Sequence, residues 1–354
     1  MQHGLTDRER QILEAVIRTY VETAEPAGSR TVARRFELGV SPATVRNAMS
    51  DLEDKGFLYH PHTSAGRIPT DMAYRYFVDA LMAPVRLTAA EQRRLRKELR
   101  DDESGGPLDR LLGRALKVLG LITGELGIAM APRLDAVVLE KLELVRVSSE
   151  KILLVLTLKN GVIRTVYVDV PVAAPAESIA AVTMILNERL AGHSLSEIRD
   201  SLSERLRDAG GGDESRELIN ILLQSADDLL TPAELSEGRL MLGPASILAS
   251  QPEFAAGDRL RTLLELTEQP ELLHSVLDAR PRDGAATITI GSEHVHPQLN
   301  PFTLVTSEYR VGRLSGLLGV MGPTRMPYEK VAAIVEYTSM LMSELDRSGE
   351  TPDR

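Results

Sequence analysis

The stretch SPATVRNAMS combines a helical apolar stripe with an unusual opposite side. At about 100° per residue, Ala43, Asn47 and Ser50 fall together on that side, flanked by Thr44 and Arg46. An asparagine amide can pair with adenine and a guanidinium with guanine, while small methyl groups can pack on thymine. Solvated helices usually carry Glu and Lys at such positions, so this surface is typical of a helix that lies in the major groove of DNA.

The surrounding residues predict a helix-turn-helix that would position this surface. The tetrapeptide TDRE, which begins at Thr6, has the spacing of a capping box and opens a first helix. Ser29 can cap a short second helix, RTVARRF, and Gly39 suits positive φ in the turn after it. Ser41 can cap the third helix, with Pro42 at its first position. The expected core stripe of this third helix is Val45, Ala48, Met49 and Leu52.

The segment GFLYHPHTSAGRIPT predicts a wing, a short β-ribbon that follows the third helix. FLYH and RIP read as short strands and PHTSAG as the turn between them, after which Thr70 caps a helix through DMAYRYFVDALM. The tip offers Thr63, Ser64, the Gly66 backbone and Arg67 to phosphates or to the minor groove. A winged helix that docks on RNA or protein is the alternative. The expected DNA-binding residues are Arg30, Thr31, Arg34, Ser41, Ala43, Thr44, Arg46, Asn47, Ser50, His62, Thr63, Ser64 and Arg67.

Composition sets the broad class. The 354 residues predict two or three domains, and 43% hydrophobic with 26% charged residues indicates a globular chain. The net charge of −10 argues weakly against nucleic acid, yet residues 26–50 hold four arginines against one acid, Glu37. No apolar run reaches about 18 residues and no apolar leader is present, so neither a membrane span nor export is expected. The absence of cysteine excludes thiol chemistry and fits the cytoplasm.

Other candidate chemistry is weaker. His294 and His296 could share one face of a strand as a metal pair beside Glu293, but no third ligand stands at a convincing spacing, and exposed loop histidines are favoured. Neither a phosphate-binding glycine loop nor a nucleophile–base pattern is present, so no cofactor, metal or catalysis is expected. In GPTRMPY, Arg325 and Tyr328 can either line a ligand pocket or tie the last helix to a sheet, and the structural role is favoured.

The rest of the chain predicts an α+β domain with an insertion. β-rich runs follow an apolar helix near LDRLLGRALKVLGLITGEL, with a hairpin signal at KNG, and further strands precede a long final helix. Residues 191–280 read as mostly helical and interrupt this sheet pattern. The helix in ESRELINILLQSADDLL has apolar spacing that suits either a partner helix or the core of the same chain, and a dimer contact is favoured because palindromic DNA demands a two-fold axis.

Motifs near both ends of the chain carry a family resemblance. GSRT, SPATVRN and PHTSAGRIPT resemble the N-terminal domain of bacterial heat-inducible transcription repressors of the HrcA type, and GPTRMPY resembles a C-terminal motif of that family. The resemblance implies a dimeric repressor that binds an inverted-repeat operator upstream of chaperone genes, with activity maintained by the chaperonin. It also implies a GAF-like domain interrupted by an inserted dimerisation domain.

The expected fold is therefore α+β and multidomain: a winged helix-turn-helix and a GAF-like α+β domain interrupted by a mostly helical dimerisation domain. We expect the C-terminal two-thirds to be marginally stable and to lose its dimer on heating. The alternatives are a metabolite-sensing regulator with a ligand in the GAF-like domain and, with less support, an enzyme. The expected boundaries are 1–82 for the winged helix, 83–106 for a linker, 107–190 and 251–354 for the GAF-like domain, and 191–250 for the insertion.

Overall fold

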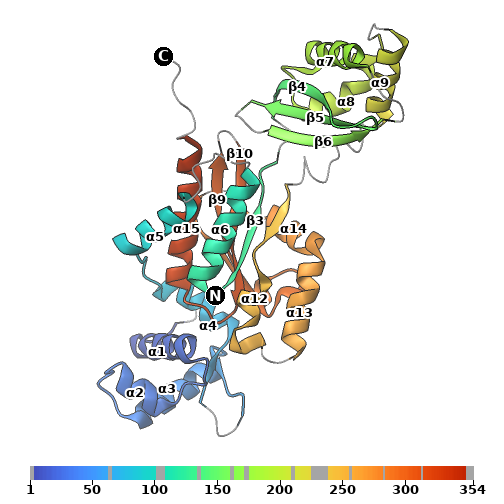
Figure 1. The fold of residues 1–354 in the computed structure, drawn as a ribbon. Coiled ribbons are helices and arrows are strands. Elements are labelled where there is room, and N and C mark those ends of the chain that lie inside the picture. Colours follow the sequence, from blue (N-terminus) through green and yellow to red (C-terminus); the bar gives the residue numbers. More distant parts are fainter. Residues whose placement is uncertain are drawn as a thin grey trace.

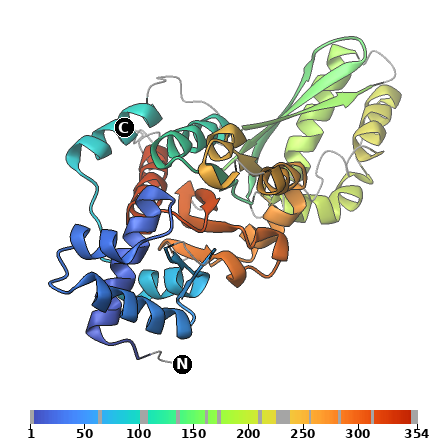
Figure 2. The same cartoon turned by 90° about the horizontal axis from the view of Figure 1, so that it is seen from below.

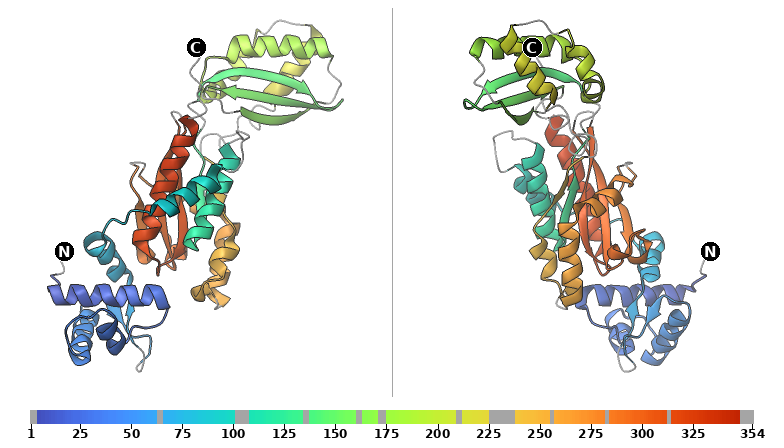
Figure 3. Two further views of the ribbon diagram at one scale, coloured as in Figure 1. Left: turned by 60° about the vertical axis from the view of Figure 1, so that its left-hand side comes forward. Right: turned by 90° about the vertical axis from the view of Figure 1, so that its right-hand side faces the viewer.

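The computed structural model is elongated, with three units in a row (Figure 1). The N-terminal unit, which ends with η1 at Leu81 and is called the head, lies at one end. A sheet-based unit, the body, lies in the middle, and a smaller unit, the outer unit, lies at the end opposite the head (Figure 3). Seen from below, the outer unit projects away from both the body and the head (Figure 2). The structure describes residues 4–62, 66–100, 108–133, 137–159, 163–170, 175–208, 212–224, 238–254, 257–281, 284–311 and 314–347.

The head contains the expected helices and ribbon. The capping box is confirmed, because Glu9 N–H donates to Thr6 Oγ1 (3.2 Å) and Thr6 N–H to Glu9 Oε2 (2.8 Å). The second helix differs at its start: its N-cap is Gly28, and Ser29 is already helical. The elements of the head are α1 (Asp7–Thr23), α2 (Ser29–Arg35), α3 (Pro42–Asp54), β1 (Leu58–Tyr59), β2 (Ile68–Pro69), α4 (Asp71–Tyr76) and the π-turn η1 (Phe77–Leu81).

The body is built on a five-stranded antiparallel sheet in the order β7-β3-β10-β9-β8. Successive side chains of a strand point to opposite faces, so Val305 faces one helical layer and Leu304 the other. α6 and α15 cover one face, and α12, α13 and α14 cover the other. The strands are β3 (Leu126–Met130), β7 (Leu240–Leu242), β8 (Thr287–Ile290), β9 (Phe302–Val311) and β10 (Leu314–Pro323). The helices are α6 (Leu108–Thr123), α12 (Ala245–Ala249), α13 (Gly257–Glu268), α14 (Pro270–Asp278) and α15 (Tyr328–Arg347).

The outer unit is inserted between two neighbouring strands of the body. β3 ends at Met130, which pairs with Leu240 at the start of β7, and Ala131 N–H donates to the Arg239 carbonyl (2.9 Å). The chain therefore leaves and re-enters the sheet at one place. The outer unit has its own apolar core, in which a sheet of order β4-β5-β6 packs against three helices. Its elements are β4 (Leu139–Arg146), β5 (Lys151–Leu158), β6 (Ile163–Asp169), α7 (Ala176–Leu190), α8 (Leu195–Leu206) and α9 (Asp213–Gln224).

This arrangement corrects the expected limits of the insertion. The three strands of residues 139–169 do not join the body sheet, so the boundary expected at 190 falls inside the outer unit. The apolar side of α9 is also already in use, because Leu218, Ile219 and Leu222 are buried in the core of the same chain. The intrachain interpretation of ESRELINILLQ is therefore correct for this face.

The expected linker at 83–106 contains a packed helix, α5 (Ala89–Arg100). Leu95 and Leu99 of this helix are buried in the main core. Glu91 pairs with Lys330 of α15 at 3.1 Å. Most of the segment thus belongs to the body rather than to a free connection.

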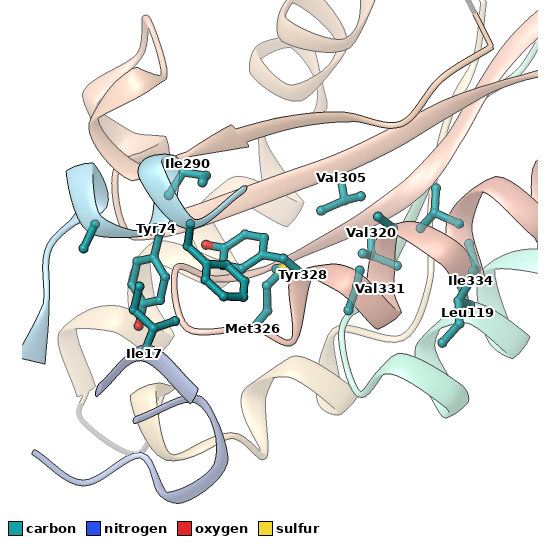
Figure 4. Packing of buried hydrophobic residues seen from close by; sticks show 14 of the residues in the cluster. Ile17, Tyr74, Leu119, Ile290, Val305, Val320, Met326, Tyr328, Val331 and Ile334 are labelled. Atoms are coloured by element: carbon teal, nitrogen blue, oxygen red, sulfur yellow. The ribbon is translucent and has the colours of Figure 1, made fainter. Parts of the chain in front are cut away.

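Head and body share one continuous apolar core (Figure 4). The rings of Tyr74, from α4, and Tyr328, from α15, lie 5.6 Å apart, and Ile17, Ile290 and Met326 pack around them. Buried side chains of both units pack on one another in this core, and this packing joins the head to the body.

Candidate nucleic-acid interface

The exposed side of α3 has the composition that the periodicity predicts. Ala43, Arg46, Asn47 and Ser50 are exposed, while Val45, Ala48, Met49 and Leu52 are buried. Ser41 caps the helix by accepting from Thr44 N–H (3.2 Å), and its hydroxyl lies 3.0 Å from that of Thr44. The cap fixes the start of α3, so the first turns present a rigid surface of one amide, one guanidinium and small groups.

The helix before it, α2, adds positive charge next to this surface. Arg30, Thr31 and Arg34 are exposed, and neither these arginines nor Arg46 forms an ion pair with any residue that the structure describes. Arg35, in contrast, pairs with Glu22 of α1. The turn from α2 to α3 contains two residues with positive φ, and Gly39 (φ 65°) is where the sequence predicts one. Cations without carboxylate partners remain available to phosphates.

The β-ribbon is anchored to α3 by Glu53. One carboxylate oxygen lies 2.6 Å from His60 Nδ1, and the other accepts from Arg67 Nη2 (2.8 Å) and Nε (3.1 Å). Burial alone would raise the pKa of Glu53, but the bond to His60 and the charge of Arg67 outweigh it and lower the pKa. Gly66 also packs closely, because a Cβ there would lie 2.5 Å from the Ala27 backbone.

These contacts change the interpretation of the predicted wing residues. The Arg67 side chain is only 12% exposed and is held by Glu53, so the structure does not present it as a free phosphate contact. Its main chain pairs with Ala27 in both directions. His62 is exposed, whereas Thr63 and Ser64 lie outside the described residues. The role of His60 was missed, since its partner lies on another element.

Arg325 and Tyr328 lie at the junction of head and body. Arg325 Nη1 donates to the Val21 carbonyl of α1 (2.7 Å), and its other nitrogens bind Glu253, with Nη2 to Oε2 at 3.0 Å. The bond to Glu253 raises the pKa of Arg325. Burial likewise raises the pKa of Tyr328, whose hydroxyl donates to the Thr324 carbonyl. Both side chains therefore have structural partners.

The two histidines lie in a loop, as favoured, but His294 is not exposed. His294 and His296 lie between two 3₁₀ turns, η3 (Gly291–Glu293) and η4 (Pro297–Leu299), rather than on a strand. His294 is also buried, and burial lowers its pKa to about 4. Glu293 is bound to Arg75. Among the described residues, no three His, Asp or Glu side chains are placed to hold a metal ion.

Comparison with known proteins gives consistent matches. Residues 109–332 match the family model described as HrcA protein C terminal domain. The chain is 39% identical to the heat-inducible transcription repressor HrcA of Chlorobium phaeobacteroides (strain BS1), over 97% of this chain and 99% of the relative. It is 38% identical to the protein of the same name from Chlorobaculum tepidum, over 96% of this chain and 97% of that relative.

A solved structure shares the fold. A crystal structure at 2.2 Å resolution, described only as a hypothetical protein, matches 98% of this chain and 100% of its own with a TM-score of 0.64 and 22% identity. Within the described part of the chain, no helix is both long and apolar enough to cross a membrane.

Proposed function

The chain belongs to the HrcA family of heat-inducible transcription repressors, which repress heat-shock genes and are not enzymes, and we propose that it acts as a homodimer on an inverted-repeat operator. The single observation that carries the DNA-binding mode is the exposed side of α3. The first two turns of α3 present Ala43, Arg46 and Asn47 to water, and these side chains have no role in the apolar core beneath them. Such a side matches the donors, acceptors and methyl groups of base edges.

In this proposal the head is a winged helix, with α3 as the recognition helix in the major groove. Asn47 reads adenine, Arg46 reads guanine, and the small side chains fit against thymine methyl groups. Arg30, Thr31 and Arg34 bind phosphates beside the groove. His62, Thr63 and Ser64, in the turn of the ribbon, bind the DNA backbone beside this groove. Arg67 holds this ribbon in place through Glu53.

The homodimer is proposed to form through the outer unit, and the body is proposed to be GAF-like. The helices α7–α9 cover one face of the β4-β5-β6 sheet, while Val145 and Tyr167 on the other face are 47% and 65% exposed. Leu153 pairs with both across the strands, so the three side chains form one apolar row. An exposed apolar row of this kind favours a contact with a second copy. A two-fold dimer then matches the two-fold symmetry of an inverted repeat.

Heat release and dependence on the chaperonin are proposed from the family resemblance. One packing feature supports a heat-labile outer unit: leucines such as Leu154, Leu186 and Leu202 line a partly open apolar cavity of about 40 Å³ in its core. A void of this size costs on the order of 1 kcal/mol of stability. A dimer that stays folded and DNA-bound well above growth temperature would contradict this part of the proposal. The proposed compartment is the cytoplasm.

One observation favours the alternative of a metabolite-sensing regulator. Arg133, Arg239, His274 and Glu271 line a groove of about 890 Å³ next to the points where the outer unit joins the body. A ligand that binds the folded state raises the melting temperature. A screen of metabolites that produces no such rise counts against ligand control.

The proposed function is tested by titrating the full-length protein against labelled duplexes and following fluorescence anisotropy. One duplex carries the inverted repeat from upstream of the chaperone genes, and the other carries the same bases in scrambled order. We expect a preference of about a thousandfold or more for the repeat, as in specific DNA readers. Equal binding that disappears at higher salt, with chaperonin present as well as absent, would reject the proposal.

A further inference from the structure

Two arginines of the head reach into the body. Arg18 of α1 donates from Nη2 and Nη1 to the two carboxylate oxygens of Glu329, at 2.8 and 3.2 Å. Arg75 of α4 donates from Nε and Nη2 to the two oxygens of Glu293, at 2.6 and 2.7 Å. Arg75 Nη2 also donates to the Ile288 carbonyl (2.7 Å). Bidentate pairs of this kind fix orientation as well as distance.

A third arginine reaches from the body into the head. The Val21 carbonyl lies in the last turn of α1, where helices leave carbonyls without an intrahelical partner, and Arg325 supplies its donor. Glu253 binds the same guanidinium, and the two side chains are only 14% and 9% exposed. The carboxylate therefore holds Arg325 in one orientation, pointing at the head. The GPTRM segment is thus part of the junction.

The backbone at the junction is also shaped for close contact. Asp71 at the start of α4 accepts from Ser292 N–H (2.8 Å). Gly291 has φ 51°, and a Cβ there would lie 2.2 Å from the Asp71 carboxylate. Tyr74 of the same helix packs against Tyr328 of the body, near Ile290 (Figure 4). A side chain at position 291 would displace the Asp71 carboxylate and strain the backbone at this φ, so the contact depends on glycine.

We propose that Arg325, Arg18 and Arg75 are positioning residues for operator recognition: they fix each head on its body and so set the spacing at which the two α3 helices of a dimer meet their half-sites. This inference rests on the proposed function. None of the three has to touch DNA. Each acts on a segment of the junction, and together they hold α1 and α4 against the start of α15 and residues 288–293.

The physical consequence is a dependence on half-site spacing. When two heads are held at one separation, binding of the first half-site presents the second head to its own half-site, and this linkage is worth about 10² to 10⁴ in affinity. When the heads are loosely attached, part of that gain is lost, and a wrong spacing is tolerated better. Binding to a single half-site depends on one head only and does not change.

The test uses full-length Arg325→Gln and Glu329→Gln proteins, alone and combined, with Glu344→Gln as the matched control. Glu344 is an exposed residue of α15, the same helix as Glu329, and has no ion pair with a described residue. Each protein is titrated with three duplexes: the natural inverted repeat, one half-site, and a repeat whose half-sites are moved by about 5 base pairs, half a helical turn.

We expect the wild type and Glu344→Gln to prefer the natural spacing strongly. In the combined variant the ratio of natural to shifted affinity should fall by about tenfold or more, while half-site affinity stays at the wild-type value. Half-site affinity also reports that the head is still folded. An unchanged ratio in the combined variant would overturn the inference, as would a parallel loss of half-site binding. A wild type without any preference for spacing would instead overturn the proposed dimeric function.

Discussion

Asn47 and Arg46 lie side by side on α3, and each has a different partner in the proposed groove. Neither is needed for the core, since both are exposed and the buried side of the helix is provided by Val45, Met49 and Leu52. When either side chain is replaced by alanine, loss of DNA binding can therefore be distinguished from loss of folding.

We expect Asn47→Ala and Arg46→Ala each to weaken operator binding by about 1–3 kcal/mol and to relax the preference at one base pair. The measurement is anisotropy titration against operators with single substitutions. Asp51→Asn is the control, because Asp51 is exposed on a later turn of the same helix. If Asn47→Ala binds the operator as the wild type does, the proposed docking of α3 is wrong.

Arg34 and Arg67 provide a second comparison: Arg34 has no ion pair with a described residue, whereas Arg67 is paired with Glu53. Affinity for DNA falls as salt rises, and Arg34→Ala should make the plot of log affinity against log salt less steep by about 0.9, the value for one phosphate contact. Arg67→Ala should leave the slope unchanged and destabilise the head by about 1 kcal/mol, since it removes the pair with Glu53. A salt slope that falls equally in both variants would show that Arg67 leaves Glu53 to bind DNA.

Elements differ in how far the sequence could predict them. Caps and periodicity are local, so α1 and α3 and the burial of Val45 and Leu52 are confirmed. β7 was missed because its three half-buried residues show no alternation of apolar and polar side chains. They form a strand only because they pair with β3, more than a hundred residues earlier. The same long-range pairing determines where the insertion begins. The partner of Arg325 was equally beyond reach, because Val21 lies some three hundred residues away.

Directly before β3, Glu125 is a buried acid whose titration should be measurable. Glu125 is 2% exposed, and burial raises its pKa to about 8, against the opposing effects of the Gln251 hydrogen bond and the Arg325 charge. Because the pKa of Glu125 is raised in the folded state, its contribution to the free energy of unfolding is fully present below the pKa of an unfolded glutamate. This contribution is lost as the pH rises through about 8.

Glu125→Gln should therefore remove most of the decline in melting temperature between pH 6 and pH 8. The amide is nearly isosteric and keeps an oxygen that can accept from Gln251. The measurement is thermal unfolding across this pH range, with Glu188→Gln, at an exposed position of α7, as the control. Parallel pH curves for Glu125→Gln and the wild type would contradict the assignment of a neutral Glu125.

At the scale of the whole molecule, the two ends have separate tasks in the proposed function. The head and the outer unit lie at opposite ends of the molecule (Figure 3); in the proposal the head reads DNA and the outer unit pairs two copies. The body connects them through two adjacent strands on one side and the arginine junction on the other. A change that separates the copies should then leave the reading of a half-site intact.

Tyr167→Glu tests this division. A carboxylate in the apolar row with Val145 and Leu153 would have to be desolvated in the dimer, at a cost of several kcal/mol. We expect a monomer in sedimentation at micromolar concentration, with wild-type affinity for a half-site and reduced affinity for the inverted repeat. Leu121→Glu is the control, because Leu121 is 61% exposed on α6 of the body. A Tyr167→Glu protein that remains dimeric would move the dimer contact away from this sheet face.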